Sequence, residues 1–197
     1  MEDPKKKMIA DLSSIQKYIL VLLSSNNYES IKGNLWLQKE LFLLSQTYDD
    51  LKNESEFEPY FLGPHSEVVE EEFDDMLQAG LVDRDDSKIK LTPRGKEIGL
   101  FFCQKISNNN QKIISDLKEF LNDLSQDELL GFIYFSYPDM RKESIKFENI
   151  KQKRNTIALN LYRKGKISVG KAAEIAGMTI ETFIRFLKQR NIEVYRE

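Results

Sequence analysis

Apolar residues recur at helical spacing along most of this chain, which predicts a mainly α-helical protein. Polar breaks separate four such segments in the first half, at residues 12–25, 35–48, 67–79 and 93–107. Between the third and the fourth, short runs at 81–83 and 88–91 predict two strands. Three helices, a two-stranded wing and a further helix form a winged helix. Residues 11–107 are therefore predicted to be winged-helix-like.

Two more helices are predicted over residues 111–136, where Ser125 and Glu128 have the spacing of a capping box. Their apolar residues lie beyond the winged core, so we expect them to form a homodimer interface. The next stretch is rich in charge and is predicted to be a hinge. The predicted domains are residues 1–140 (winged-helix-like, with two added helices, for protein contact), 141–154 (the hinge) and 155–197 (a helix-turn-helix).

Three short helices are predicted within residues 155–190. Ser168 and Thr179 are good N-caps for the second and third helices. Gly177 lies in the turn between them, where a left-handed backbone carries no Cβ penalty. Ala173, four residues earlier, is small enough for two helices to cross closely. This spacing predicts a helix-turn-helix whose core is formed by Ile175, Met178, Ile180, Phe183, Phe186 and Leu187.

The polar residues of this segment have the composition of a DNA-reading surface. Arg can bond guanine edges, Gln can bond adenine edges, and Thr and Lys can hold phosphates. We expect double-stranded DNA as the partner. The predicted DNA-binding residues are Lys166, Ser168, Lys171, Thr179, Glu181, Thr182, Arg185, Lys188 and Gln189.

Charge along the chain favours this interpretation. Residues 151–197 carry a net charge of +7, whereas the whole chain carries −3, so residues 1–150 carry −10. A basic end on an acidic body is typical of a nucleic-acid contact. The alternative is a three-helix packing unit that touches no DNA.

The last quarter of the chain resembles a family of small prokaryotic helix-turn-helix proteins that are described as antitoxin-like. The resemblance rests on LYRKGKISVGKAAEIAGMTIETFIRFLKQRNIEV, and it implies a DNA-binding fold. The matching residues are Tyr162, Gly165, Ile167, Ser168, Gly170 to Glu174, Ala176 to Met178, Phe183 and Val194.

A looser resemblance, over residues 11–107, is to the Panacea domain of SocA-like antitoxins. The alternative is that these residues are turn and core chemistry shared by many winged helices. Ile89 or Lys90 stands where that pattern has Tyr. The matching residues are Leu37, Gln38, Lys39, Phe42, Leu43, Gly63, Pro64, Ser66, Gly80 to Val82, Leu91, Thr92 and Gly95.

The helix before the wing, at residues 67–79, would enter the major groove in a DNA-reading winged helix. Here it reads EVVEEEFDDMLQA, and its acidic face would meet the phosphate backbone. Like charges facing one another cost several kcal/mol in an interface. We therefore expect this domain to contact protein rather than DNA.

The composition argues against other classes. Hydrophobic residues make up 41% and charged residues 31%, with one Cys and one His. A single cysteine, Cys103, cannot form an internal disulfide, which suits a reducing cytoplasm. His65 is expected to be solvated or to cap a helix. We expect no metal site, no cofactor and no enzymatic activity, because phosphate loops, triads and Cys/His clusters are missing. No apolar run reaches the roughly 20 residues of a membrane span, and MEDPKKK precedes no signal core.

Together these observations predict a cytoplasmic, homodimeric transcriptional regulator that is antitoxin-like and represses its own operon. The alternative is a protein-interaction module whose C-terminal helices clamp a toxin-like partner without binding DNA. A basic clamp would fit an acidic partner as well as DNA, so a preference for particular base sequences distinguishes the two.

Overall fold

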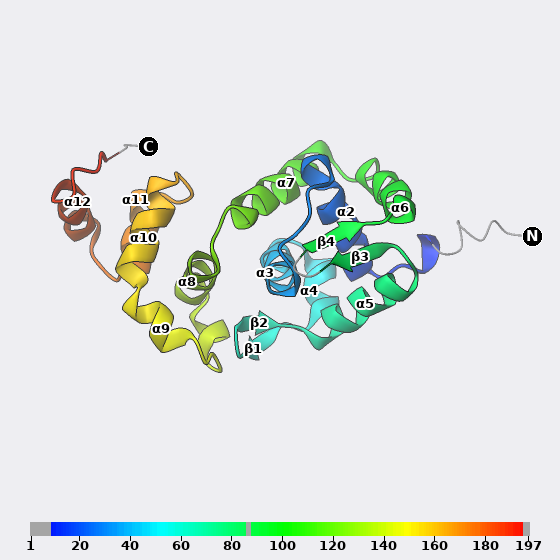
Figure 1. The fold of residues 1–197 in the computed structure, drawn as a ribbon, viewed down its shortest axis with the longest axis horizontal. Coiled ribbons are helices and arrows are strands. Elements are labelled where there is room, and N and C mark those ends of the chain that lie inside the picture. Colours follow the sequence, from blue (N-terminus) through cyan, green and yellow to red (C-terminus); the bar gives the residue numbers. More distant parts are fainter. Residues whose placement is uncertain (1–8, 86–87, 195–197) are drawn as a thin grey trace, which may run out of the picture. The chain divides into compact units, whose positions relative to one another are not determined.

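The computed structural model describes residues 9–85 and 88–194, and the protein is mainly α-helical, as predicted (Figure 1). The chain forms two compact units, which are described separately below. The first contains Met1–Glu58 and Pro64–Asp123, and the second contains Pro59–Gly63 and Leu124–Glu197.

Helices and a small sheet build the first unit. Its elements are α2 (Ser14–Tyr28), α3 (Asn34–Ser45), α4 (Asp49–Ser55), α5 (Glu67–Gln78), β3 (Val82–Asp85), β4 (Lys88–Leu91), α6 (Pro93–Cys103) and α7 (Asn108–Asn122). Strands β1 (Glu58–Tyr60) and β2 (Gly63–His65) pair as a hairpin, whose tip belongs to the second unit.

Helix α2 lies at the centre of the first unit and packs against α4, α5, α6 and α7. Ile19, Leu20 and Leu22 on this helix are fully buried. β3 and β4 pair antiparallel, with Val82 opposite Leu91, and β4 alternates buried and exposed residues as a half-covered strand should. Ile31 adds an isolated bridge to Ile89 in the same sheet.

Buried polar side chains connect α3 to the turn before α5. The amide of Gln38 donates to the Ser66 carbonyl and accepts from the Ser66 backbone N–H, both at 3.0 Å. The Lys39 ammonium donates to the Pro64 carbonyl at 2.8 Å. Burial lowers the pKa of Lys39 to about 7. Ser66 also caps α5 by accepting from the Val69 backbone N–H, so one small turn fixes two helices.

The C-terminal end of α2 is held by a lysine from α7. Asn26, Asn27 and Tyr28 all have positive φ, a conformation that is costly for Tyr. The buried Lys118 ammonium donates to the carbonyls of Leu22, at 2.9 Å, Ser25, at 3.1 Å, and Glu29.

These carbonyls belong to the last turn of α2 and the residues after it, where no backbone N–H of the helix is available to bond them. Burial lowers the pKa of Lys118 and raises that of the fully buried Glu40, and the opposite charges of the two side chains partly offset these shifts.

Short segments connect the helices of the first unit. Gly33 holds the cap position of α3, with φ of 85°, and Asn34 is the first helical residue. The acidic segment after α3 forms α4, in which Leu51 is buried and Glu54 accepts two hydrogen bonds from Ser14. The β1–β2 hairpin follows α4 in the chain.

Apart from the tip of the β1–β2 hairpin, the described part of the second unit is helical. Its elements are α8 (Gln126–Ser136), the 3₁₀ helix η1 (Pro138–Arg141), α9 (Phe147–Gln152), α10 (Arg154–Arg163), α11 (Val169–Ala176) and α12 (Ile180–Lys188). Helix α8 packs against α10 and α11, and Gly131 lies directly against Ile157. The capping box predicted at Ser125 and Glu128 is present.

The two units divide at a different point from the predicted domains. Helix α8, expected in the first domain, belongs to the second unit because Leu129, Leu130 and Ile133 are buried there. The predicted hinge, 141–154, is folded and contains α9, with Ile150 buried. Most apolar residues of α7 and α8, such as Ile114, Leu121 and Ile133, are buried within their own units, whereas Ile113 is 36% exposed. A homodimer interface at 111–136 stays a prediction.

Candidate nucleic-acid interface

Helices α10 to α12 occur where the sequence predicted three short helices. The Ser168 hydroxyl accepts from the Lys171 backbone N–H at 3.2 Å, and Thr179 caps α12 by accepting from Thr182. Gly177 has φ of 69°, and the Met178 N–H bonds the Ala173 carbonyl at 3.0 Å. Only Gly177, Met178 and Thr179 separate the two helices, so α11 and α12 meet at a tight turn.

Small and aromatic side chains fill the space between these helices. Ala172 and Ala173 on α11 and Phe183 and Leu187 on α12 are all buried. The Tyr162 ring meets Phe183 edge to face, with ring centroids 6.2 Å apart. A larger side chain at Ala173 would force the helices apart, because packed interiors leave no spare volume.

Arg154 braces the turn, a role that the sequence did not reveal. Its Nε donates to the Ile175 carbonyl at 2.7 Å and its Nη2 to the Glu174 carbonyl at 3.2 Å, so the guanidinium caps the end of α11. A Cβ at Gly177 would collide with that guanidinium. The partners are 20 and 21 residues away, and no local pattern connects them.

A row of bonded polar side chains runs along the exposed side of α12. The Thr179 hydroxyl donates to the Thr182 hydroxyl at 3.1 Å, and Arg185 Nη2 donates to the same oxygen at 3.4 Å. Spacing by three residues places the three side chains on one helix face. This contact holds Arg185 beside Thr182 while most of its guanidinium donors remain available.

The predicted DNA-binding residues fall into two groups. Thr179, Glu181, Thr182, Arg185, Lys188 and Gln189 are on α12 or its caps, and all except the half-buried Thr182 are exposed. Lys166, Ser168 and Lys171 precede or begin α11 and are half-buried. Lys171 is engaged by Glu174, with Nζ to Oε1 at 2.8 Å. The pair lies at the surface, with Lys171 half-buried and Glu174 exposed. A surface ion pair contributes little stability, so a phosphate can replace the carboxylate.

Glu181 introduces a negative charge at the start of α12. Its pKa is lowered by hydrogen bonds from its own backbone N–H and from Thr179, and also by the Arg185 charge. An ionised carboxylate only accepts hydrogen bonds. Among base edges in the major groove, it can therefore accept from cytosine N4.

Several basic side chains of the second unit form ion pairs within the unit. Lys164 Nζ lies 2.8 Å from the buried Glu128 carboxylate, and Lys153 lies 2.7 Å from Asp127. Burial acts to raise the pKa of Glu128, but hydrogen bonds from Lys164 and Ser125 outweigh it and lower the pKa. The unit has 14 Lys and Arg against 9 Asp and Glu, a net charge of +5. The charge available to a partner is thus smaller than the +7 of residues 151–197 suggests.

Ile180 departs from the prediction that it lies in the core. Its side chain is 47% exposed, although Phe183 and Leu187 on the same helix are buried. Ile180 begins α12, and opposite its Cδ1 lies Gly170, which has no side chain to cover it.

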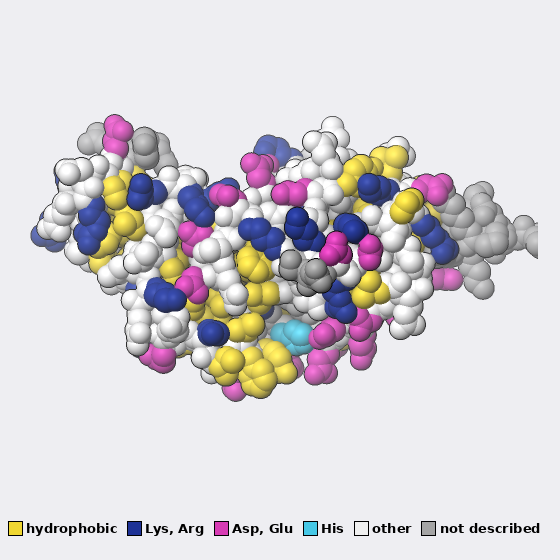
Figure 2. Space-filling model, viewed as in Figure 1, with side chains coloured by type: hydrophobic (Ala, Val, Ile, Leu, Met, Phe, Trp, Pro, Cys, Tyr) yellow, Lys and Arg dark blue, Asp and Glu magenta, His cyan; other side chains and the backbone are white. Residues whose placement is uncertain are grey.

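The corresponding surface of the first unit is acidic. Glu67, Glu70, Glu71, Asp74 and Asp75 on α5 are all exposed. Figure 2 shows acidic side chains gathered next to the single histidine. His65 Nε2 lies 3.4 Å from Glu70, so the histidine is part of this surface.

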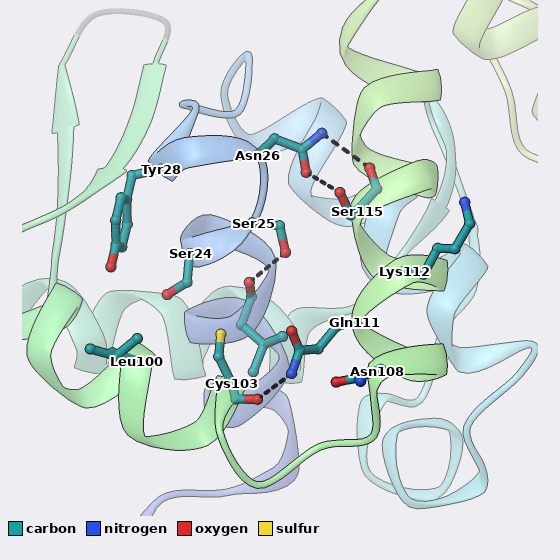
Figure 3. Close-up of a pocket in the computed structure, with 11 residues that line it drawn as sticks. Ser24, Ser25, Asn26, Tyr28, Leu100, Cys103, Asn108, Gln111, Lys112 and Ser115 are labelled. Carbon is teal, nitrogen blue, oxygen red and sulfur yellow. Dashed lines mark hydrogen bonds between the residues drawn. The ribbon is translucent and has the colours of Figure 1, made fainter.

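A pocket of about 460 Å³ lies in the first unit, between the end of α2, α6 and α7 (Figure 3). The polar groups of its wall bond one another: Ser115 Oγ donates to Asn26 at 2.8 Å, and Gln111 donates to the Cys103 carbonyl at 2.6 Å. Burial raises the pKa of the Cys103 thiol, which disfavours a reactive thiolate. The pocket therefore carries no chemical signature of a particular ligand.

Within residues 9–85 and 88–194, no group of three or more His, Cys, Asp and Glu side chains is placed to hold a metal ion. No helix in these ranges is long and apolar enough to cross a membrane.

Comparison with known proteins finds similarity for the C-terminal third. Residues 133–197 match the family described as "Uncharacterised protein family (UPF0175)". A 36-residue stretch is 50% identical to the UPF0175 protein of Archaeoglobus fulgidus and covers 18% of this chain and 41% of that protein. The chain therefore spans less than half the length of this relative. No solved structure matches the chain. The matched region begins within α8 and contains α9 to α12, so it includes the whole candidate interface.

Proposed function

We propose that this protein is a DNA-binding transcriptional regulator whose α12 enters the major groove. The observation that carries the proposal is the row Thr179–Thr182–Arg185 on the open side of α12, following a tight turn in a basic unit. A helix-turn-helix reads DNA with the second helix of such a pair. The protein would be antitoxin-like and would repress its own operon, as its sequence resemblance implies.

Each residue has a role that follows from its chemistry. Arg185 is the guanine reader and Gln189 the adenine reader, and Glu181 accepts from cytosine. Hydroxyl and ammonium groups hold phosphates and fix the orientation on the duplex. The phosphate contacts are Lys166, Ser168, Lys171, Thr179, Thr182 and Lys188.

The first unit is assigned to protein contact and to pairing two copies of the chain. Two observations support this assignment. The β3–β4 hairpin follows α5 and precedes α6 in the chain, as the predicted winged helix requires, and residues of the Panacea resemblance are hydrogen-bonded to one another: Gln38 to Ser66, and Lys39 to Pro64. Homodimers place two reading helices on half-sites about one turn, ~34 Å, apart.

The test is titration of the full chain with duplexes selected from a random pool and with scrambled duplexes, at two salt concentrations. Arg185→Ala is expected to cost ~1–3 kcal/mol of binding and to relax sequence preference. Lys171→Ala should weaken all sequences alike and lower the salt slope by about one.

Lys112→Ala in the first unit is the matched control. Lys112 is also a lysine paired on its own helix, with Asp116 at 2.6 Å, and its loss should leave both quantities unchanged. If Arg185→Ala and Lys171→Ala leave DNA affinity unchanged while the protein stays folded, the proposal fails.

A protein-interaction module is the second candidate, favoured by exposed apolar surface on the second unit. The stacked rings of Tyr60 and Phe61 are 46% and 52% exposed, and Ile145 is 71% exposed. The Ile145 N–H bonds the Phe61 carbonyl at 3.1 Å, so the three side chains belong to one site. Exposed apolar clusters mark contact surfaces. Absence of any base-sequence preference in the titration would favour this candidate.

A further inference from the structure

Ile180 is the large apolar side chain that stays exposed within residues 147–194, a range that the structure describes. It is 47% exposed, while Phe183 and Leu187, which share its helical stripe, are buried. The difference arises because Ile180 is in the first turn of α12, next to the side-chain-free Gly170. Packing within the unit therefore leaves part of this side chain without a partner.

Ile180 lies at the N-terminal end of α12, the end that contacts bases in a helix-turn-helix. Helix-turn-helix proteins contact base edges with the N-terminal residues of the second helix. Ile180 is the first residue of α12, directly after its cap Thr179. The neighbouring side chains along the exposed side are hydroxyls, a carboxylate and a guanidinium, which can bond polar base edges.

An isoleucine can make no hydrogen bond to DNA. The apolar group that base pairs present in the major groove is the C5-methyl of thymine. We propose that Ile180 packs against a thymine methyl and thereby selects thymine at one position of each half-site. This inference rests on the proposed function and adds a specificity-determining residue to it. Ile180 and Arg185 are five positions apart, which is a rise of about 7.5 Å along the helix. The selected thymine is thus expected within about two base pairs of the guanine that Arg185 reads.

The experiment removes the methyl group from the DNA. The full chain is titrated with a duplex selected from a random pool and with copies in which each thymine in turn is replaced by deoxyuridine. Deoxyuridine pairs as thymine does and lacks only the methyl. At one position this replacement should weaken binding by about fourfold, as expected for one buried methyl group. The same replacement should have no effect on Ile180→Ala.

Two further variants isolate the contact. Arg185→Ala should keep the sensitivity to deoxyuridine, because it alters a different base contact. Ile145→Ala is the matched control, since it also shortens an exposed isoleucine in the same unit and should keep the full fourfold effect. Circular dichroism checks that each variant is folded.

The outcomes distinguish the inference from the proposed function. Sequence-selective binding with no deoxyuridine effect, or an effect that persists in Ile180→Ala, overturns the thymine contact and leaves the regulator proposal in place. Failure to enrich any sequence overturns both. Loss of the effect in Ile180→Ala alone among the three variants supports the contact.

Discussion

The two units present helices of similar kind with opposite charge. In the first unit, α5 follows the Ser66 cap and carries six acidic residues and no basic one. In the second unit, α12 follows the Thr179 cap and carries one acidic residue, Glu181, and two basic residues, Arg185 and Lys188. The first unit has 15 Lys and Arg against 23 Asp and Glu, a net charge of −8, compared with +5 in the second. Both helices expose polar side chains along one side. The comparison teaches that such a helix suits the negatively charged DNA backbone only where its own charge is not strongly negative, which is why DNA contact is proposed for α12 and not for α5.

The units also differ in how they are held together. The first relies on buried polar groups that join distant segments, as Lys118, Lys39 and Gln38 do. In the second, α11 and α12 pack through short apolar and aromatic side chains on neighbouring helices. Substitutions should therefore have separable effects on the two units.

The largest effect is expected from Lys118→Met. It removes the buried ammonium and leaves three carbonyls and Glu40 without it. Each buried carbonyl that is left without a donor costs ~1–3 kcal/mol. Chemical denaturation should show this loss in the first unit. Lys112→Met, on the exposed side of the same helix, is the control and should change little. An equal loss in both variants would contradict the role assigned to Lys118.

Ala173→Leu should act in the second unit. Overpacking the contact between α11 and α12 is expected to cost ~1–3 kcal/mol or more, with loss of DNA binding. Hydrogen exchange of α11 and α12 compared with α2 would locate the damage. The same substitution at the exposed Ala79 is the control. Weakened protection in α2 but not in α12 would show that the units are not separable as described.

Stability of the first unit should rise with pH above neutrality. Burial lowers the pKa of Lys39 to about 7, below the unfolded value of ~10.4. Between these values the unfolded chain binds one more proton, so the free energy of unfolding increases by up to ~1.4 kcal/mol per pH unit. Denaturation from pH 7 to 10 should show a smaller slope in Lys39→Met than in Lys112→Met. Equal slopes would mean that Lys39 is not the group responsible.

The smallest effect is expected from neutralising α5. Glu71→Gln combined with Asp75→Asn should change DNA affinity by less than about twofold, because exposed charges beyond the ~10 Å Debye length are screened. Titration against the selected duplex measures it. A tenfold gain in affinity would indicate that α5 faces the DNA.

Local chemistry predicted much of the secondary structure. Helix caps depend on one side chain and the backbone N–H two or three residues later, which the sequence displays directly. The caps predicted and found are Ser125, Ser168 and Thr179.

Features that depend on distant partners were not predictable. Arg154 and Lys118 find their carbonyls only after the helices have packed. Ile180 matched the apolar period of α12, yet whether it is covered depends on the residue facing it from α11, which is Gly170. The candidate DNA contacts could be chosen from residue type and spacing. The hydrogen bond from Arg185 to Thr182 depends on the side-chain conformations in the folded protein, which the sequence does not display.

The bond from Lys118 to the Leu22 carbonyl also has a consequence for synthesis on the ribosome. The two residues are 96 positions apart, and at 5–20 residues per second the lysine emerges roughly 5–20 s after its partner. Throughout that interval the apolar side of α2 has no cover from α7. The newly made first unit is therefore prone to aggregation until α7 has emerged, because its apolar surface is exposed. α11 and α12, whose partners follow within a few residues, can form as soon as they leave the exit tunnel.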